Sequence, residues 1–520
     1  MHFKRNETVR LIIFYLFTFF IAVYFLSTSI RNFYNTEASQ LRFQVTKSIV
    51  ERFDLSVPEG TGMRGSDGRE YSWLGVGSAI LAVPFYIAGK LIGGTPENAV
   101  SVMNQIFGAA TVVLVFLFSA SLGYSRRASV IVSFLYGLCT MAWPLAKSPF
   151  DHNVETFFVL LSVYLIYLRM VDKKISYLVS SAISLGIAFI TRPISMLIMP
   201  CLFIFMIIYS AQRLNFKSIV KPVVRDTCIF SLSFLPFLCL NFYYNYYRFG
   251  SIFETGYSLI ALRAGINFFK DTSFFRGLSG FLISPGKGFF YYSPVAVLFF
   301  FSIRNFTKKH PGLGISFIFI IISYLFLLSK YLYWHGDWAW GPRYLLVITP
   351  FLIIPIAELF ESGVWSGKRY LKAIALFIFA LSLIIQIAAV SVDFQKYFVN
   401  LRFEEKVEFT VAYGKGVQPI AEPPTETYFS WRKSPILSQL GFIYKMAKDI
   451  KDYRDMEASE RAALVEPFKR DPGYYIFDFW WLYKYFLDGN YSGFITALIL
   501  LLIAIYAAVK LWKVSAYNDY

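Results

Sequence analysis

The sequence has few charged residues, little histidine and little cysteine. Lys, Arg, Asp and Glu make up 16% of the 520 residues, whereas 56% are hydrophobic and 20% are aromatic. Because soluble domains carry about 25% charged residues, this composition excludes a soluble globular protein. The four cysteines lie in apolar runs without paired spacing, which argues against disulfides and cysteine metal sites. They are Cys139, Cys201, Cys228 and Cys239.

Charge is scarcest inside continuous apolar blocks of membrane-crossing length. A helix needs about 20 apolar residues to cross a bilayer core of about 30 Å. We therefore predict an all-α polytopic membrane protein with about 12 transmembrane helices. The predicted spans are 11–30, 99–121, 128–146, 153–170, 176–191, 194–210, 227–246, 290–303, 313–330, 345–361, 371–390 and 492–512.

The net charge of +17 comes from basic residues between the spans. They gather in every second connection between spans, which predicts a cytoplasmic N-terminus. This role in topology explains the positive charge, so we expect no nucleic-acid partner. The block 73–94 is apolar enough to cross the membrane. Counting it as a span, however, would move every later loop to the opposite side of the membrane. We therefore expect it to lie on or dip into the outer leaflet. The retained first span after a basic N-terminus suits a bacterial inner (plasma) membrane, with the active site facing the periplasm.

This topology divides the chain into three parts. Residues 1–390 form a transmembrane catalytic module, whose first outer loop, 31–98, carries surface helices. Residues 391–491 form an extracytoplasmic segment that we expect to be acceptor-related. Residues 492–520 form the last transmembrane helix and a cytoplasmic tail.

Motifs for several cofactors are absent. The chain has no Walker loop, which argues against direct ATP hydrolysis, and no strand–turn–helix pattern for a dinucleotide. With only four histidines and no HxxxH spacing, we expect no metal and no cofactor. A donor with a pyrophosphate would make a divalent metal more attractive.

An acidic residue follows the first span. The stretch NTEASQLRFQVTKSIVERFDLSV, 35–57, has a helical stripe of Leu41, Val45 and Ile49. Glu37 would lie in the first turn of this helix, at the membrane surface. One interpretation is a general base that faces a cavity. The other is a carboxylate that stabilises its own helix N-terminus by about 0.3–1 kcal/mol.

Six further motifs carry a family resemblance. They are DGREYSWLGVGSAILAVPFY (67–86), KSPFDHNVETFFVLLSVYLIYL (147–168), GIAFITRPISMLIMP (186–200), NYYRFGSIFETGYSL (245–259), FLISPGKGFFYYSPV (281–295) and WAWGPRYLLVITPFL (338–352). In this order, over about residues 10–390, the chain resembles the polyprenyl-phosphate-sugar glycosyltransferases of the GT-C superfamily. Protein O-mannosyltransferases and the lipid A aminoarabinose transferase are familiar members. At the acidic position these relatives have an Asp or an Asp-Glu pair, whereas this chain has Thr36-Glu37.

The resemblance implies sugar transfer at the outer leaflet. An acceptor hydroxyl attacks the anomeric carbon of a polyprenyl-phosphate-linked sugar, with inversion, and the lipid phosphate leaves. A carboxylate base near the acceptor and cationic donors on the phosphate would carry this chemistry. The implied partners are the lipid-linked sugar, the bilayer and a glycan, lipid or protein acceptor.

The candidate residues follow from these roles. Glu37 is the predicted catalytic base. The predicted phosphate ligands are His152, Arg192, Arg248, Lys287 and Arg343. The predicted substrate-binding residues are Asp67, Tyr71, Glu155, His335, Asp337 and Trp338. Alternatives stay open for single residues: Arg192 can extend its charge to the membrane surface, and Arg343 can anchor its span.

Two other functions compete with sugar transfer. A polymerase or ligase would use a polyprenyl-pyrophosphate oligosaccharide on the same fold. A lipid or sugar transporter (flippase) would place charges at mid-membrane in several spans and show paired halves. The predicted spans carry almost no charge at their centres, and the sequence has no apparent internal repeat.

Overall fold

The structure is a computed structural model of the whole chain. It describes residues 7–29, 37–148, 150–213, 216–336, 338–361, 369–407, 410–411, 421–455 and 476–516.

Long apolar helices dominate the described residues and confirm the predicted all-α polytopic fold class. Nine of them, within these ranges, are long and apolar enough to cross a membrane. They are α1 (Glu7–Leu26), α4 (Pro96–Ser121), α7 (His152–Asp172), η2 with α9 (Pro193–Ala211), α10 (Phe216–Phe249), α15 (Pro311–Ser329), η4 through α17 (Arg343–Glu361), α18 (Arg369–Ser391) and α24 (Ser492–Ala516). Three apolar helices are shorter: α3 (Gly77–Leu91), α8 (Ile175–Thr191) and α12 (Phe274–Ile283).

Shorter elements connect these helices. The helical ones are α2 (Glu37–Arg52), α5 (Arg126–Cys139), α6 (Ala142–Lys147), α11 (Tyr257–Ala264), α13 (Phe289–Tyr292), η3 (Pro294–Leu298), α14 (Phe299–Lys309), α16 (Thr349–Ile353), α19 (Gln395–Val399), α20 (Pro435–Asp455) and α23 (Trp480–Asp488). The strands β1 (Ser56–Val57), β3 (Glu70–Tyr71) and β2 (Met63–Arg64) form a small antiparallel sheet in that order. The strands β4 (Thr410–Val411) and β5 (Ala421–Glu422) form a second pair.

Two predicted spans are interrupted. The predicted span 128–146 divides into α5 and α6 at Thr140, whose Oγ1 accepts a hydrogen bond from the backbone N–H of Ala142 at 3.2 Å. The predicted span 290–303 divides at Ser293 and Pro294, because proline has no N–H to continue the helix. Hydropathy could not locate these breaks, since the residues around them stay apolar.

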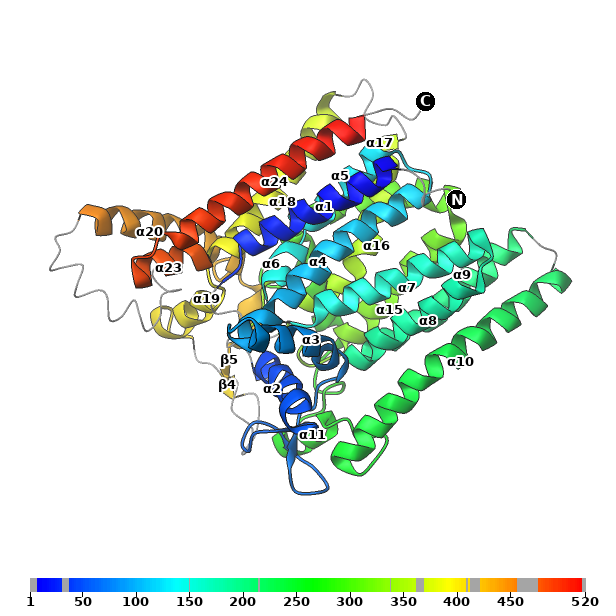
Figure 1. Cartoon of the computed structure of the whole chain (residues 1–520), viewed down its shortest axis with the longest axis horizontal. Coiled ribbons are helices and arrows are strands. Elements are labelled where there is room, and N and C mark those ends of the chain that lie inside the picture. Colours follow the sequence, from blue (N-terminus) through cyan, green and yellow to red (C-terminus); the bar gives the residue numbers. More distant parts are fainter. Residues whose placement is uncertain are drawn as a thin grey trace.

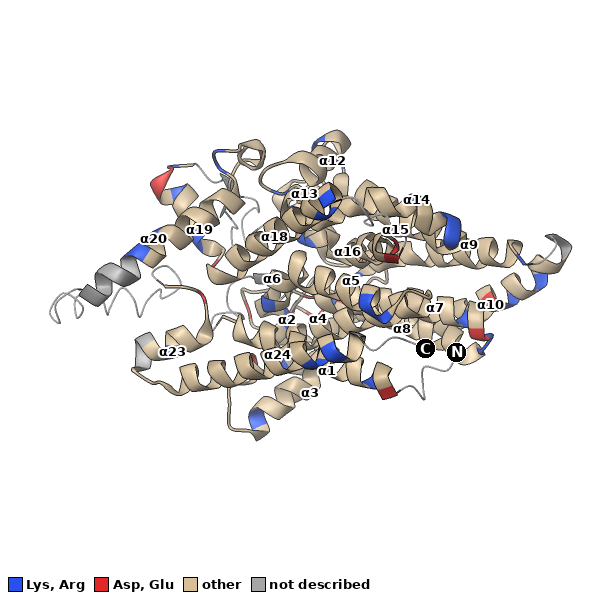
Figure 2. Ribbon diagram, turned by 90° about the horizontal axis from the view of Figure 1, so that it is seen from above, with Lys and Arg blue, Asp and Glu red and all other residues tan. Residues whose placement is uncertain are grey.

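The two ends of the bundle differ. Both termini of the chain lie at one end in Figure 1, and α2, α11 and α19 lie at the other. We call the end that holds the two termini the basic end, and we call the opposite end the loop end. At the basic end, Glu358 of α17 accepts a hydrogen bond from the Tyr124 hydroxyl at 3.0 Å and lies 3.6 Å from Nζ of Lys309. In Figure 2 the charged segments gather near helix ends and in loops, and most of the ribbon between them is uncharged.

The helix α3 lies across the loop end, where the sequence predicts a surface helix. At its start, a Cβ on Gly77 would lie 2.3 Å from Oγ1 of Thr191, the last residue of α8. At its other end, a Cβ on Gly89 would lie 2.8 Å from Cα of Pro96, the first residue of α4. Glycine at both positions lets α3 pack closely against two spans.

The segment after residue 475 is fastened to the bundle by a buried ion pair. Nζ of Lys147 in α6 lies 2.6 Å from Oδ2 of Asp478 and donates to the carbonyl of Val390 at 2.7 Å. Nε1 of Trp480 in α23 donates to the carbonyl of Phe25 at 2.9 Å. These contacts hold α23 against the loop ends of α1 and α18, beside α24 (Figure 1).

Candidate active site

Five ionisable residues from four segments meet inside the loop end. Arg42 lies in α2, Asp151 and Glu155 lie at the start of α7, Arg192 follows α8, and Arg343 begins η4. We call these five residues the arginine cluster. Four of these residues are between 1% and 9% exposed. The side chain of the fifth, Arg192, is 19% exposed.

Asp151 holds two of the arginines. Its Oδ2 lies 3.0 Å from Nη2 of Arg42, and its Oδ1 lies 3.3 Å from Nη1 of Arg192. The outer helix α2 is therefore joined to the end of α8 through the residue that precedes α7. A carboxylate that accepts from two guanidinium groups forms strong, charge-assisted hydrogen bonds.

Glu155 holds Arg192 from the other side. Its Oε2 lies 2.8 Å from Nε of Arg192, while its Oε1 accepts hydrogen bonds from the hydroxyls of Ser195 at 2.8 Å and Tyr324 at 3.2 Å. Arg192 is thus bound by both carboxylates. Its guanidinium also lies 5.3 Å from the ring centre of Tyr344.

Local sequence explains this convergence. Pro193 ends α8, so that Arg192 has an extended backbone with φ −144° and begins a new helical turn. Asp151 is the N-cap residue of α7, and Glu155 lies in its first turn. Acidic residues at a helix start are favoured by the helix dipole.

The cluster has more positive than negative charge. Three guanidinium groups face two carboxylates, and the Arg343 guanidinium lies 4.0 Å from the ring centre of Phe150, next to Asp151. Burial raises the pKa of Asp151, but the charges of Arg42, Arg192 and Arg343 outweigh burial and hold this pKa below its ordinary value. Asp151 therefore stays ionised at neutral pH, and the five side chains, counted as fully ionised, sum to one positive charge.

Some donors in the cluster have no acceptor within the described part of the chain. Nε and Nη1 of Arg42 make no hydrogen bond there, although the residue is 9% exposed. His152, which lies next to the cluster, is 1% exposed, and both of its ring nitrogens also lack a hydrogen bond there; its Nδ1 lies 3.6 Å from Oδ1 of Asp151. Buried polar groups are normally satisfied, so these atoms are available to a ligand or to ordered water.

Three predicted residues lie in an aromatic region that adjoins Arg343, since a Cβ on Gly336 would lie 3.0 Å from Cγ of Arg343. Nζ of Lys287 donates to the carbonyl of Ala339 at 2.7 Å and so joins two loops. The ring of His335 stacks on that of Tyr428 at 5.0 Å, and the ring of Trp338 stacks on that of Phe398 at 4.6 Å. These contacts hold the 281–295 and 338–352 motifs against the segment after residue 391.

Arg248 fastens α10 to the first outer loop. Its guanidinium donates to the carbonyls of Tyr244 and Ser72 and, at 2.7 Å, to Oδ1 of Asn245. It also lies 3.6 Å from the ring centre of Tyr244. All three of its nitrogens donate to protein acceptors, which is the pattern of a structural arginine.

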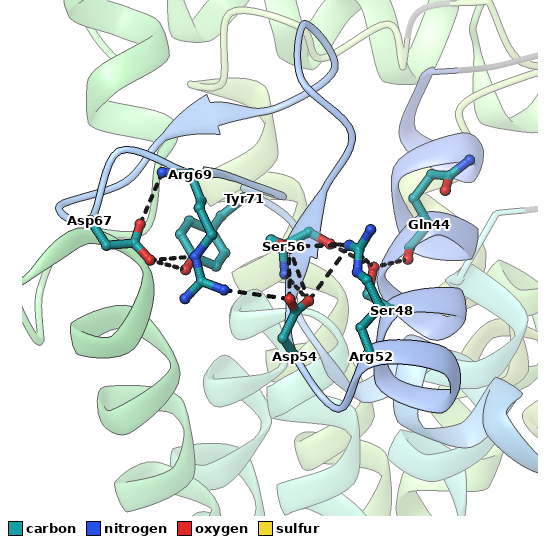
Figure 3. Close-up of polar contacts among 8 residues, drawn as sticks. All are labelled: Gln44, Ser48, Arg52, Asp54, Ser56, Asp67, Arg69 and Tyr71. Carbon is teal, nitrogen blue, oxygen red and sulfur yellow. Dashed lines mark hydrogen bonds and ion pairs between the residues drawn. The ribbon is translucent and has the colours of Figure 1, made fainter.

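Asp67 and Tyr71 belong to a network in the first outer loop (Figure 3). Oδ2 of Asp67 accepts from Nε of Arg69 at 2.6 Å and from the Tyr71 hydroxyl at 2.7 Å. Arg69 also reaches Asp54 at 3.4 Å, and Asp54 in turn lies 3.6 Å from Arg52 of α2. This network shapes the loop outside the arginine cluster.

The side chains of two predicted residues lie outside the described part of the structure. Glu37 is the first residue of α2, but its side chain is not among the described atoms. Asp337 falls between the described ranges 216–336 and 338–361. Their roles as base and substrate ligand stay predictions.

Sequence reasoning missed Arg42, Ser195 and Tyr324 as site residues and assigned Asp151 no role of its own. The available signal for Arg42 was its spacing from Thr46, because both lie on one face of α2 and both are buried. Within the described residues, no group of three or more His, Cys, Asp or Glu side chains is arranged to hold a metal ion.

The arginine cluster coincides in part with a family match. The model of the dolichyl-phosphate-mannose-protein mannosyltransferase family matches residues 80–239, a segment that includes Asp151, Glu155 and Arg192. No curated protein sequence matches the chain.

Solved membrane glycosyltransferases are similar in shape. ArnT from Cupriavidus metallidurans bound to undecaprenyl phosphate is 12% identical, with a TM-score of 0.49, and the match covers 93% of this chain and 75% of that one. The oligosaccharyltransferase of Archaeoglobus fulgidus in its apo form is 14% identical, with a TM-score of 0.48. That match covers 82% of this chain and 61% of the archaeal chain. Over residues 80–239, the family match confirms the resemblance predicted from the sequence.

Proposed function

We propose that the protein is an integral membrane glycosyltransferase. It moves a sugar from a polyprenyl-phosphate donor to an acceptor hydroxyl on the outer face of the membrane, with the loop end of the bundle facing outward. The observation that carries this proposal is the arginine cluster, a buried group with one net positive charge at the end of a membrane bundle. The family match over residues 80–239 supports the same reaction class.

The cluster suits a phosphate. Guanidinium groups bind phosphate oxygens in paired hydrogen bonds, and Arg42 has two donor atoms without acceptors in the described part of the chain. The N-terminus of α7 begins at His152, beside Asp151, and adds the partial positive charge of its helix dipole. The isoprenoid chain of such a ligand would remain in the bilayer.

The charge of the cluster favours one phosphate over two. A sugar linked to a lipid through one phosphate is a phosphodiester with one negative charge, which matches the one positive charge of the cluster. When the sugar leaves, the lipid phosphate gains charge, because a phosphomonoester carries about −1.5 to −2 near pH 7. The acceptor proton goes to the proposed carboxylate base, which lies outside these five residues, so it removes one negative charge from the site without changing the charge of the cluster. A pyrophosphate donor, as the polymerase or ligase alternative requires, would begin with excess negative charge.

A carboxylate must take the proton from the acceptor hydroxyl. Glu37 stays the proposed base, since it begins the helix that carries Arg42 and lies about 7.5 Å before it along the helix axis. Asp151 is less suited to this role, because its lowered pKa makes it a weak base. A single displacement of this kind inverts the anomeric configuration.

The transporter alternative finds less support. The described charges cluster at the two ends of the bundle, and the buried pair of Arg169 and Asp226 lies toward the basic end rather than at mid-membrane. A pathway for a polar substrate would need further charged groups between the ends.

The test is an in vitro transfer assay. Purified protein is incubated with a panel of polyprenyl-phosphate sugars and candidate acceptors, and both the glycosylated product and free polyprenyl phosphate are measured. We expect both products from the wild type, and loss of transfer with retained lipid binding for Glu37→Gln. Arg126→Gln at the basic end is the control and should keep wild-type activity. Movement of lipid-linked sugar across vesicles without any covalent product would overturn the proposal.

A further inference from the structure

Two basic side chains meet on one aromatic ring at the basic end of the bundle. The guanidinium carbon of Arg213, just after α9, lies 3.8 Å from the ring centre of Tyr209 in the last turn of α9. Nζ of Lys173, the residue that follows α7, lies 5.8 Å from the same ring centre. We call Lys173, Tyr209 and Arg213 the basic patch. Both helices end on the side of the bundle that holds the two termini (Figure 1).

The fold does not neutralise the two cations of the basic patch. Lys173 and Arg213 are exposed, and neither forms an ion pair within the described part of the chain. Asp226, whose charge acts on Lys173, is already bound by Arg169 at 2.9 Å and by Arg225 at 3.0 Å. Burial and the charges of Arg169 and Arg213 lower the pKa of Lys173 despite Asp226. The patch therefore holds two positive charges that repel each other.

The backbone of Lys173 has a conformation that glycine usually adopts at the end of a helix. Its φ is +61°, in the left-handed region, and its N–H donates to the carbonyl of Arg169 at 3.0 Å. Glycine would end α7 at a lower conformational cost, whereas lysine adds a cation beside Arg213. Asp172, the preceding residue, forms no ion pair with either cation in the described part of the chain.

Membrane topology alone does not require this convergence. Basic residues favour the cytoplasmic side wherever they lie along the connections between spans. Arg304 and Lys308 of α14 are exposed, and their helix ends beside Lys309 at the same end of the bundle. Within the described residues, neither of them contacts an aromatic ring. They supply the same kind of charge without a shared ring.

The chemistry and the position of the basic patch suit a lipid phosphate. Guanidinium and ammonium groups donate charge-assisted hydrogen bonds to phosphate oxygens. The patch lies where two membrane-length helices end, which is the level of phospholipid headgroups. Ile175 of α8 and Ile207 of α9 are exposed near it and offer an apolar surface to acyl chains. Basic sites between spans bind anionic headgroups in this way.

We infer that the basic patch binds the phosphate of an anionic phospholipid, with Lys173 and Arg213 as its cationic ligands and Tyr209 as the ring between them. A zwitterionic phospholipid is a poorer ligand, because its own ammonium group offsets the attraction. The bound lipid links the end of α7 to the end of α9 at the membrane surface. This inference does not rest on the proposed function, since the patch and the arginine cluster lie at opposite ends of the bundle.

The test compares an anionic and a zwitterionic phospholipid with the same acyl chains. Detergent-solubilised full-length protein is titrated with phosphatidylglycerol or phosphatidylcholine, and bound lipid is counted by native mass spectrometry. We expect the wild type to bind phosphatidylglycerol more tightly. The double variant Lys173→Asn with Arg213→Gln should weaken that binding about five- to thirtyfold and leave phosphatidylcholine binding unchanged. Asparagine tolerates the left-handed backbone at position 173.

Two further variants separate the basic patch from charge in general and from the end of α7. Arg304→Gln with Lys308→Gln removes the same charge from the same end of the bundle and should keep wild-type affinity for phosphatidylglycerol. Arg213→Gln alone leaves Lys173 and its backbone in place and should weaken binding about fivefold. Undecaprenyl phosphate added at an equal concentration should not displace phosphatidylglycerol from the wild type.

Three results would overturn the inference. The first is a wild type that binds phosphatidylglycerol no more tightly than phosphatidylcholine. The second is an equal loss of phosphatidylglycerol affinity in the two double variants, which would assign the binding to the overall surface charge. The third is displacement of phosphatidylglycerol by equimolar undecaprenyl phosphate, which would assign the patch to the polyprenyl lipid.

Discussion

The helix α7 carries a buried arginine–aspartate contact at each end, and the two contacts differ in kind. Near the basic end, Arg169 in the last turn of α7 binds Asp226 of α10 through two nitrogens, at 3.0 and 3.1 Å. At the loop end, Asp151 binds Arg42 and Arg192 at once. The first contact pairs one buried guanidinium with one buried carboxylate. The second belongs to a group with three guanidiniums and two carboxylates.

The difference separates a structural contact from a ligand site. The only other charged partner of Asp226 among the described ion pairs is Arg225, whose side chain is 55% exposed, so that solvent screens its charge. The five side chains of the arginine cluster are at least four-fifths buried, so solvent screens their charges less. A buried excess charge is costly unless something of the opposite sign binds to it. We therefore propose the loop end of α7 as the place where an anion binds.

The largest expected effect follows loss of Arg192. Arg192→Gln removes the residue that contacts both Asp151 and Glu155, which leaves two buried carboxylates with one fewer cation. We expect transfer activity to fall at least a hundredfold and thermal stability to drop, since breaking a buried pair costs about 3–5 kcal/mol. Initial rates and thermal unfolding in detergent measure the two effects. Arg192→Lys should recover stability better than activity, because lysine lacks the two-pronged geometry; equal recovery would count against phosphate binding.

The next effect contrasts the two aspartates. Asp226→Asn should lower stability by about 3–5 kcal/mol, as its buried arginine loses a charged partner, and should leave the affinity for undecaprenyl phosphate unchanged. Asp151→Asn should instead increase that affinity, because the cluster gains one net positive charge, while turnover falls. Parallel binding and rate measurements check this pair. Weaker binding of undecaprenyl phosphate by Asp151→Asn would contradict the proposed difference between the two ends of α7.

A moderate effect is expected for Arg42. It contacts Asp151 alone among the described ion pairs, and burial lowers its pKa more than Asp151 raises it. Arg42→Gln should weaken undecaprenyl phosphate binding about tenfold, with a smaller loss of stability than Arg192→Gln. Arg69→Gln, in the exposed loop network of Figure 3, is the control and should change neither quantity. If Arg42→Gln binds undecaprenyl phosphate as tightly as the wild type does, α2 does not contribute to the phosphate site.

The smallest effect concerns pH. The pKa of Asp151 is lower in the folded protein than in the unfolded chain, so its contribution to stability is fully present above about pH 5. That contribution is lost as pH falls through the lowered folded pKa. The difference in thermal stability between the wild type and Asp151→Asn should therefore be constant from about pH 5 to 8 and shrink in more acidic buffer. A difference that shrinks already between pH 6 and 8 would contradict the strong pairing of Asp151.

Hydropathy predicted the long helices well. The predicted spans 313–330 and 371–390 agree with α15 and α18 to within a few residues, because their apolar runs are uninterrupted. The breaks at Thr140 and Ser293 were not predictable, since they arise from capping and from Pro294 within apolar sequence.

The site was harder to predict than the fold. Pro193 marks Arg192 as the end of a helix, and the structure places Arg192 in the cluster. Arg42 has only the weaker signal of its spacing from Thr46, since its burial depends on the packing of α2 against α3. Lys287 and Arg248 have the residue types that bind phosphate, but their partners in the fold are carbonyl groups and an amide. Residue type alone cannot distinguish these cases. The acceptor-related role of 391–491 stays a prediction.

The most direct test is the affinity for undecaprenyl phosphate after removal of each arginine contact in turn. Arg192→Gln and Arg42→Gln break the contacts at the loop end, and the double substitution Arg169→Met with Asp226→Leu removes the contact near the basic end as a unit. The account predicts at least tenfold weaker binding for the first two proteins and wild-type binding for the third. Equal affinity in all three would contradict it.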